Sequence, residues 1–345
     1  MSNPLLNSFK SPANKMVLGT MTFGRQNTVS EANDQLNFAL DQGITYWDTA
    51  EMYPVPAQQA TYGDTERIIG KWFQETNRRE DVFLATKLAG PNRSMTYIRE
   101  DLTFSADSIR HGIDKSLQRL QTDYIDLYQL HWPERQSNMF GQRGFSGYDD
   151  PWEENFNSVL TCLSDCVNEG KIKHIGISNE TPWGVMRFVE ANRWQSLPKI
   201  ATVQNPYSLL NRTAEIGLAE VCFREKIDFW AYSPLAFGVL SNKYELGTAK
   251  PSDRIHAFPQ MARYNSPEAR IASKKYAQLA QKNGMTPAQL ALAFVMHQPF
   301  VSAAIIGATT MEQLKENIAA AAVVLTPELI KEVGFIHQLH PDPSP

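Results

Sequence analysis

The feature that most constrains the fold of this chain is a repeated alternation of short apolar runs with longer segments of helical periodicity. The short runs are rich in β-branched and aromatic residues, as strands are. They are also nearly continuous in apolar character, which is typical of parallel strands covered by helices. Eight such runs predict strands at residues 16–20, 44–48, 82–87, 125–131, 172–178, 200–205, 227–233 and 301–307.

Four of the intervening helical segments have recognisable starts. Each start places a hydroxyl residue, which can cap a helix N-terminus, directly before a residue favoured in the first turn. These predicted caps are Ser30 before Glu31, and Thr181, Ser266 and Thr286, each before a proline.

Eight strands with intervening helices and no linker-like tract predict an α/β fold, a single (β/α)8 TIM barrel spanning residues 1–345. A doubly wound open sheet is the alternative. It needs fewer strands, and the G-x-G-x-x-G fingerprint of a dinucleotide-binding open sheet does not follow the first predicted strand. In a barrel the C-terminal strand ends form one mouth, where active sites are built.

The composition of the chain argues against nucleic acids, membranes and metal ions as binding partners. A net charge of −4 and a pI near 6.0 leave no basic surface of the kind that nucleic acids need. The N-terminus is polar, and no apolar stretch is long enough to cross a bilayer, so we expect a cytoplasmic protein without a membrane partner. The three cysteines are too few for a disulfide framework, and Cys162 and Cys166 have no His nearby to complete a metal site. We therefore expect buried thiols and no bound metal.

Polar residues close most of the predicted strands, namely Asp48, Lys87, His131, Ser178, Gln204 and Ser233. Taken singly, each has an ordinary explanation: Asp48 could cap a helix, and His131 could bond within the core. Together they predict a site at the mouth of the barrel. Lys87 there needs a counter-ion, which Asp48 on the neighbouring strand can supply. A cation beside the Tyr53 phenol is expected to lower its pKa and suit it to proton donation to a carbonyl oxygen.

Eight motifs carry a resemblance to a known family: "GT-TFG" near residue 19, "DTAEMY" (48–53), "TK" (86–87), "LHW" (130–132), "GISN" (176–179), "QNPYSLLNR" (204–212), "AYSPL" (231–235) and "GATTMEQLKEN" (307–317). In this order the chain resembles the aldo-keto reductases, NAD(P)H-dependent (β/α)8-barrel enzymes. Within that family it is most similar to the bacterial Tas-like proteins and to the potassium-channel β-subunit branch.

The resemblance implies a catalytic tetrad of Asp48, Tyr53, Lys87 and His131, with Tyr53 as proton donor. It also implies that the cofactor is NADPH (NADP+), held across the barrel mouth. The implied cofactor-binding residues are Thr20, Met21, Gln26, Asp48, Ser178, Asn179, Gln204, Tyr232, Ser233, Pro234, Leu235, Ala236, Gly238, Lys243, Arg254, Gly307, Thr309, Gln313, Glu316 and Asn317. Among these, Tyr232 would stack on the nicotinamide, Lys243 would contact phosphate and Arg254 would face the 2′-phosphate.

The chain departs from the family pattern in three places. The family motif runs from its tyrosine straight into Gly-x-x-Glu, whereas here residues 54–62 intervene, so Tyr62 competes for the role of acid. The spacing of five residues after Asp48 selects Tyr53. Residues 1–15 predict a loose segment in place of the hairpin that closes the barrel bottom. Residues 132–152 form a long, aromatic-rich loop after the fourth strand, either a wall of the substrate pocket or a pad against the next helix.

The leading functional prediction is an NADPH-dependent reductase that converts aldehydes or activated ketones, small-molecule carbonyl compounds, to alcohols by direct hydride transfer. A slow-turnover NADP(H)-sensing protein that acts on a partner, as the channel β-subunits suggest, is the alternative. A metal-dependent barrel isomerase is a weaker one, because no acidic or histidine set joins Asp48 and His131. An oligomer is compatible with the sequence, which carries no signal for its order.

Overall fold

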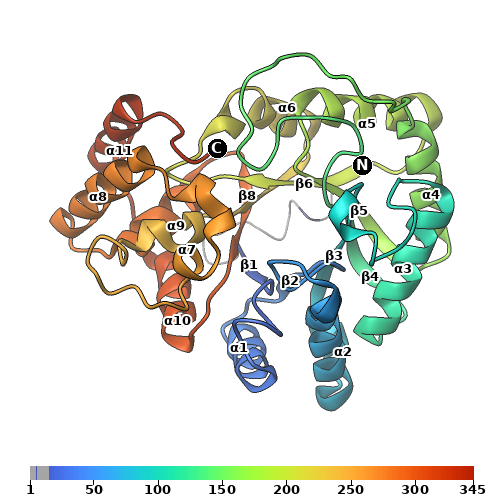
Figure 1. The fold of residues 1–345 in the computed structure, drawn as a ribbon, viewed down its shortest axis with the longest axis horizontal. Helices are drawn as coiled ribbons and strands as arrows, with labels where there is room; N and C mark the ends of the chain where they lie inside the picture. Colours follow the sequence, from blue (N-terminus) through green and yellow to red (C-terminus); the bar gives the residue numbers. More distant parts are fainter. Residues whose placement is uncertain (1–4, 6–14) are drawn as a thin grey trace.

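The structure, a computed structural model that describes Leu5 and residues 15–345, is a closed barrel of eight parallel strands in chain order, with β8 beside β1. Helices form a ring outside the strands (Figure 1). The strands are β1 (Met16–Gly19), β2 (Tyr46–Asp48), β3 (Phe83–Leu88), β4 (Ile125–Leu130), β5 (Ile172–Ser178), β6 (Ile200–Pro206), β7 (Asp228–Tyr232) and β8 (Val301–Ile306). The predicted barrel and all eight predicted strands are confirmed, with strand ends displaced by two residues at most.

The helices of the ring are α1 (Val29–Asp41), α2 (Asp64–Thr76), α3 (Ala106–Leu120), α4 (Phe156–Asn168), α5 (Pro182–Gln195), α6 (Leu218–Glu225), α8 (Pro267–Lys282), α9 (Pro287–His297), α10 (Met311–Ala319) and α11 (Pro327–Leu339). The short helix α7 (Arg254–Ala257) and the 3-10 turns Ala236–Ser241 and Pro259–Tyr264 lie between β7 and α8. These short elements form one side of the barrel mouth, as the lining of the cavity described below shows.

Three of the four predicted helix caps are confirmed, because the hydroxyls of Thr181, Ser266 and Thr286 each accept a first-turn backbone N–H. The fourth was wrong. Thr28, not Ser30, caps α1. Its hydroxyl accepts a hydrogen bond from the Glu31 backbone N–H, and the Glu31 carboxylate accepts one from the Thr28 backbone N–H. This reciprocal pair satisfies two otherwise free donors and starts the helix earlier than the sequence alone indicates.

Two clusters of buried apolar side chains stabilise the barrel. One large cluster fills the space between strands and helices, and it includes the buried thiols Cys162, Cys166 and Cys222. A smaller cluster fills the barrel interior, made of Leu5, Val17, Ala85, Leu127, Ala201, Trp230, Ala303 and Ile305. Leu5 is thus packed inside the barrel, while the rest of the predicted loose segment before Lys15 lies outside the described residues. Of the helices that the structure describes, none is long and apolar enough to cross a membrane.

A buried carboxyl at the N-terminal end of the barrel predicts a measurable pH dependence of stability. Asp228, at the start of β7, accepts one hydrogen bond from Ser302, and its Oδ2 has no partner among the described residues. Burial raises its pKa to about 6 from an ordinary 3.8. Because the folded-state pKa lies above the unfolded one, its favourable contribution is complete below about pH 4 and is lost as the pH rises through 6.

We therefore expect the stability of Asp228→Asn relative to the wild type to increase by about 3 kcal/mol between pH 3.5 and pH 7. The reason is that the pKa of Asp228 is about 6 in the folded protein and 3.8 ordinarily, and each unit of difference corresponds to about 1.4 kcal/mol. Urea unfolding of both proteins across that range measures the difference. Parallel curves of free energy against pH would contradict the expectation.

Candidate active site

The C-terminal ends of the strands bring six predicted site residues to one end of the barrel. Asp48 closes β2, Lys87 lies one residue before the end of β3, and His131 directly follows β4. Ser178 closes β5, Gln204 lies in β6, and Ser233 directly follows β7. Parallel register places Asp48 beside Gly19, and Ser178 beside Gln204. A cavity of about 850 Å³ opens here, and all of these residues except Lys87 line it.

Lys87 does not line the cavity, and it contacts two other residues of the predicted tetrad, Asp48 and Tyr53. Its Nζ donates to Asp48 Oδ2 at 2.6 Å, to the Thr49 carbonyl at 2.8 Å and to Tyr53 Oη at 3.4 Å. The side chain is fully buried. All three ammonium donors therefore have partners, and a charge that would be costly in isolation is held in one position.

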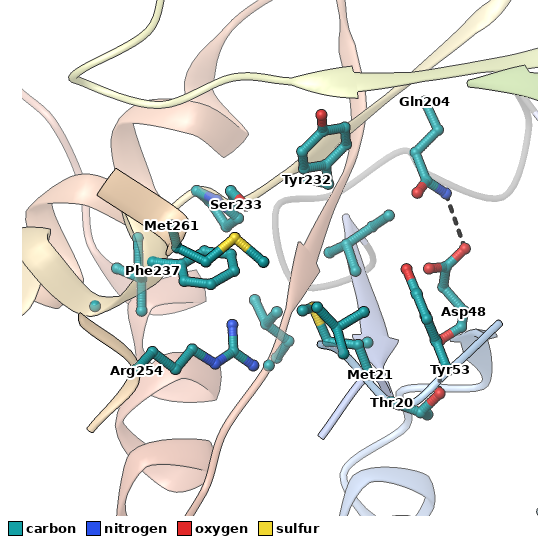
Figure 2. A pocket seen from close by; sticks show the side chains of 18 of the residues that line it. Thr20, Met21, Asp48, Tyr53, Gln204, Tyr232, Ser233, Phe237, Arg254 and Met261 are labelled. Carbon is teal, nitrogen blue, oxygen red and sulfur yellow. Dashed lines mark hydrogen bonds between the residues drawn. The ribbon is translucent and has the colours of Figure 1, made fainter. Parts of the chain in front are cut away.

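Asp48 is engaged on both oxygens. Its Oδ1 accepts from Gln204 Nε2 at 2.8 Å, shown as the dashed line in Figure 2, and from Gln129 Nε2 at 3.2 Å. The following helix, α2, has Gly63 as its N-cap. Asp48 is therefore not a helix cap, because its side chain binds an ammonium and two amides.

The predicted lowering of the Tyr53 pKa was wrong. Burial raises the pKa of Tyr53 above its ordinary value, and the nearby charge of Lys87 only partly opposes this. The phenol therefore keeps its proton at neutral pH, whereas the sequence argument predicted a lowered pKa because it considered the cation without the burial. Burial would also lower the pKa of Lys87, but Asp48 and Tyr53 outweigh it and raise that pKa. Burial, assisted by the charge of Lys87, holds the pKa of His131 well below its ordinary value, so the ring is neutral.

The structure separates the two candidate tyrosines. Tyr53 lines the cavity with its hydroxyl beside Lys87. Tyr62 instead accepts a hydrogen bond from Arg119 Nη1 at 3.0 Å and is not among the residues that line the cavity. Burial raises the pKa of Tyr62 to about 12. Tyr53, the residue selected by spacing, is therefore the tyrosine that the fold places beside Lys87.

Most of the predicted cofactor residues surround the same cavity. The lining includes Thr20, Met21, Asp48, Ser178, Asn179, Gln204, Tyr232, Ser233, Pro234, Leu235, Gly238, Lys243, Arg254, Gly307, Thr309, Gln313, Glu316 and Asn317. Two predicted residues do not line it. Ala236 is fully buried, and Gln26 accepts a hydrogen bond from Arg254 Nε at 3.2 Å without lining the cavity itself. Both therefore support the wall rather than form it.

The two predicted phosphate ligands differ in their surroundings. Lys243 forms an ion pair with Asp253, so its charge is already compensated. Arg254 stacks over the Phe237 ring, 4.8 Å from the ring centroid, and no carboxylate in the described part of the chain pairs with it. An arginine that is partly buried without a counter-ion favours an anionic ligand.

The backbone that follows β7 is unusual. Ser233, Ala236, Phe237 and Asn242 all have positive φ, from 46° to 62°, as does Gly238 at 89°. Residues with a side chain rarely adopt this left-handed region, and such strain concentrates where the chain closely approaches a ligand. The segment 233–242 therefore has the character of a ligand-binding loop.

The long loop after β4 divides into two parts. Trp132, Met139 and Phe140 line the cavity, as the pocket-wall prediction expects. Phe145 and Tyr148 are exposed and pack on each other, with ring centroids 5.1 Å apart. Further along, Trp152 packs on Phe156 of α4, with centroids 5.6 Å apart. The first part of the loop therefore forms part of the cavity wall, and its contact with substrate stays a prediction. The end of the loop packs against the next helix, as the pad prediction expects.

Three residues that the sequence reasoning missed support the site. Gln129 lies two residues before His131, on the same face of β4, and strand alternation could have found it. Glu51 Oε1 accepts from the Ala89 backbone N–H and from Arg99 Nη1, both at 2.6 Å. Glu51 and Arg99 thereby tie the segment that carries Tyr53 to the end of β3. Arg99 lies in an irregular stretch between predicted elements, and nothing in the sequence pattern pointed to it.

Among the residues that the structure describes, no group of three or more His, Cys, Asp and Glu side chains could hold a metal ion. The cavity is instead lined by Asp48, Tyr53 and His131, by amide and hydroxyl side chains, and by Arg254, which has no carboxylate partner among the described residues.

Comparison with known proteins agrees with this architecture. The model of the aldo/keto reductase family matches residues 15–336. The chain is 44% identical over 329 residues to "Protein tas" of Escherichia coli (strain K12), covering 95% of each chain. It is 33% identical over 337 residues to "Uncharacterized oxidoreductase YrpG" of Bacillus subtilis (strain 168), covering 96% of this chain and 93% of that one. It is 31% identical over 305 residues to "Aldo-keto reductase yakc [NADP(+)]" of Schizosaccharomyces pombe, covering 88% and 82%. This chain therefore belongs to the aldo/keto reductase family of oxidoreductases.

Proposed function

We propose that the protein reduces aldehydes or activated ketones to alcohols with NADPH, by direct hydride transfer, and that Tyr53 is the general acid. The observation that carries this proposal is the Lys87 ammonium, which bonds Asp48 at 2.6 Å and Tyr53 at 3.4 Å at the wall of a large cavity. The Tyr53 hydroxyl is thereby held as a proton donor at the wall of the cavity, which is large enough for a cofactor and a substrate.

The cavity residues fit NADPH. Arg254 lacks a carboxylate partner among the described residues, and the 2′-phosphate is a suitable anion for it. Ser178, Asn179 and Gln204 offer hydroxyl and amide groups to the nicotinamide carboxamide. Tyr232 offers a ring face, held by a 2.6 Å hydrogen bond from its hydroxyl to Asn179. The relative named as NADP(+)-dependent supports the same choice of cofactor.

Bound NADPH would supply the hydride that reaches the carbonyl carbon. Tyr53 holds a proton on Oη and transfers it to the carbonyl oxygen, so carbon and oxygen together gain the two hydrogens of an alcohol. Lys87 stabilises the phenolate that remains, and Asp48 keeps Lys87 charged. His131 stays neutral and lines the cavity, so it can orient the carbonyl oxygen without adding a second cation.

The proposal is tested by measuring NADPH oxidation and alcohol formation with a panel of aldehydes and ketones. We expect one alcohol formed for each NADPH consumed. Tight NADPH binding with negligible turnover across the panel would reject the reductase and favour the nucleotide-sensing alternative.

The choice of NADPH over NADH predicts a selective effect at Arg254. Arg254→Ala should weaken NADPH binding by about 10- to 100-fold, the usual worth of hydrogen bonds to a charged group, and should weaken NADH much less. Dissociation constants from cofactor fluorescence measure both. Arg25→Ala is the matched control, since Arg25 bonds the Pro56 carbonyl and stacks on Phe258 without lining the cavity. Equal losses for the two cofactors would remove Arg254 from the phosphate site.

A further inference from the structure

A buried ion pair outside the cavity contacts the turn that carries Tyr53. Glu51 lies in this turn, which the Tyr53 backbone N–H closes on the Ala50 carbonyl at 3.0 Å. The Glu51 carboxylate pairs with Arg99 at 2.6 Å, and the two side chains are 1% and 6% exposed. Neither residue lines the cavity. Any part that the pair has in the reaction must therefore act through other residues.

The pair connects the turn to the strand end that carries Lys87. The Glu51 backbone N–H donates to the Lys87 carbonyl at 3.1 Å, and Glu51 Oε1 accepts from the Ala89 N–H at 2.6 Å. Arg99 Nη1 donates to the same Oε1 at 2.6 Å, and its Nη2 donates to the Ala89 carbonyl at 2.5 Å. Arg99 Nε donates to the Ser108 hydroxyl of α3 at 2.8 Å. The turn and the chain directly after β3 are thus held as one unit.

This unit controls a contact that tolerates little displacement. Tyr53 Oη and Lys87 Nζ are 3.4 Å apart, near the upper limit for a hydrogen bond. A small shift of the turn would break this contact, and a misplacement of about 1 Å can lower the rate of an enzyme by about 100-fold. The position of the turn therefore matters for proton transfer even where the fold is intact.

Stability alone does not account for charged residues at this place. Taking two charges out of water is costly, and well-packed apolar side chains often stabilise a fold as well as a buried ion pair does. Apolar attraction is non-directional, whereas a guanidinium presents its donors in a fixed geometry. Arg99 uses its three nitrogens on acceptors of three different residues. The pair is therefore suited to fixing a position rather than to filling space.

We propose that Glu51 and Arg99 are positioning residues of the reductase, which hold the Tyr53 hydroxyl within reach of Lys87 without touching cofactor or substrate. This inference rests on the proposed function. Loss of the pair should lower kcat, because the acid is then misplaced relative to the ammonium. The affinity for NADPH and the KM for the carbonyl compound should change little, because the side chains that line the cavity are all retained.

The first test replaces both partners at once. A double variant, Glu51→Gln with Arg99→Met, keeps side chains of similar length and leaves no buried charge unpaired, so we expect it to fold. Its kcat should fall by about 10- to 100-fold, with an unchanged dissociation constant for NADPH. Near-normal kcat in the folded double variant would overturn the proposal. Arg99→Lys, which keeps the charge but not the three-way geometry, should show a smaller loss, and it provides the test if the double variant does not fold.

Arg79 offers a matched control at the other end of β3. It pairs with the buried Asp126 at 2.8 Å and donates to the Val82 carbonyl at 2.7 Å, while Asp126 accepts from the Leu84 N–H at 3.0 Å. A clamp of the same kind thus holds the start of the strand, away from the barrel mouth. Arg79→Lys should leave kcat per folded molecule unchanged. Equal falls in kcat for Arg79→Lys and Arg99→Lys would assign both pairs to general stability and overturn the proposal.

Hydrogen exchange followed by mass spectrometry gives a measurement that does not depend on turnover. The double variant should exchange faster than the wild type at residues 49–53 and at Ala89, and Arg79→Lys should leave both places protected. If the wild type binds NADPH but reduces no carbonyl compound, the reductase activity is rejected, and exchange alone then decides whether the pair positions the turn. Unchanged exchange at residues 49–53 would overturn that role.

Discussion

Replacing Tyr53 with Phe is expected to lower kcat for carbonyl reduction by about 10²–10⁴-fold, the usual contribution of general acid catalysis. The substitution removes only the hydroxyl that Lys87 contacts at 3.4 Å and keeps the ring that lines the cavity. NADPH affinity should therefore be retained. Single-turnover kinetics with saturating NADPH, together with a titration of the cofactor, separate the two effects.

Tyr62→Phe is the matched control for that experiment. Tyr62 lies nine residues later, in the insertion, and its hydroxyl bonds Arg119 rather than Lys87. Its loss should change kcat little. If Tyr62→Phe abolished reduction and Tyr53→Phe did not, the insertion would lie on the other side of the catalytic residue and the proposed acid would be wrong.

The barrel was predictable because its determinants are local and repeated. Each apolar run is a strand in its own right, and helix caps such as Thr181 depend only on residues three positions away. The cap at α1 shows the limit of this argument. Ser30 and Thr28 are both good caps, and the return contact from Glu31 decides between them.

The site was less fully predictable, because it depends on contacts between distant parts of the chain. Asp48 and Lys87 could be paired because neighbouring parallel strands share an end. The contact of Gln129 with Asp48 and the bridge from Arg99 to Glu51 depend on where irregular segments and barrel-facing side chains meet. No periodicity of the sequence encodes such contacts.

The pKa of Tyr53 illustrates the same point in energetic terms. The sequence identifies the nearby cation, and a cation alone favours the phenolate. Burial is a property of the folded chain, and here it is the larger effect, so the pKa rises. A general acid with a raised pKa remains protonated until the substrate oxygen accepts its proton.

Replacing Asp48 with Asn is expected to lower kcat by at least about two orders of magnitude, since the ammonium beside the acid then loses its counter-ion. In the native protein, Asp48 and Tyr53 raise the pKa of Lys87 against the opposing effect of burial. Without the Asp48 carboxylate, burial becomes dominant and lowers that pKa, so Lys87 can lose its proton and with it the ability to stabilise the Tyr53 phenolate. The pH profile of kcat should shift accordingly.

The pH dependence of protein stability tests the loss of the Lys87 counter-ion independently of kcat. In the native protein the raised pKa of Lys87 stabilises the fold at neutral pH, and this contribution is lost only as the pH rises through the folded-state value. In Asp48→Asn the folded-state pKa should lie below the ordinary 10.5, so the unfolded chain binds the extra proton and the stability of the variant should fall as the pH is lowered from 10 toward 7.

Asp126→Asn is the matched control, because Asp126 is a buried strand carboxylate paired with Arg79 and Lys173 outside the cavity. It should cost stability and leave kcat per folded molecule unchanged. Thermal melting and kcat measured across pH on both variants therefore distinguish a catalytic counter-ion from a merely structural ion pair. Near-normal kcat in Asp48→Asn would leave Asp48 with a structural role alone, and its proposed part in keeping Lys87 charged would be wrong.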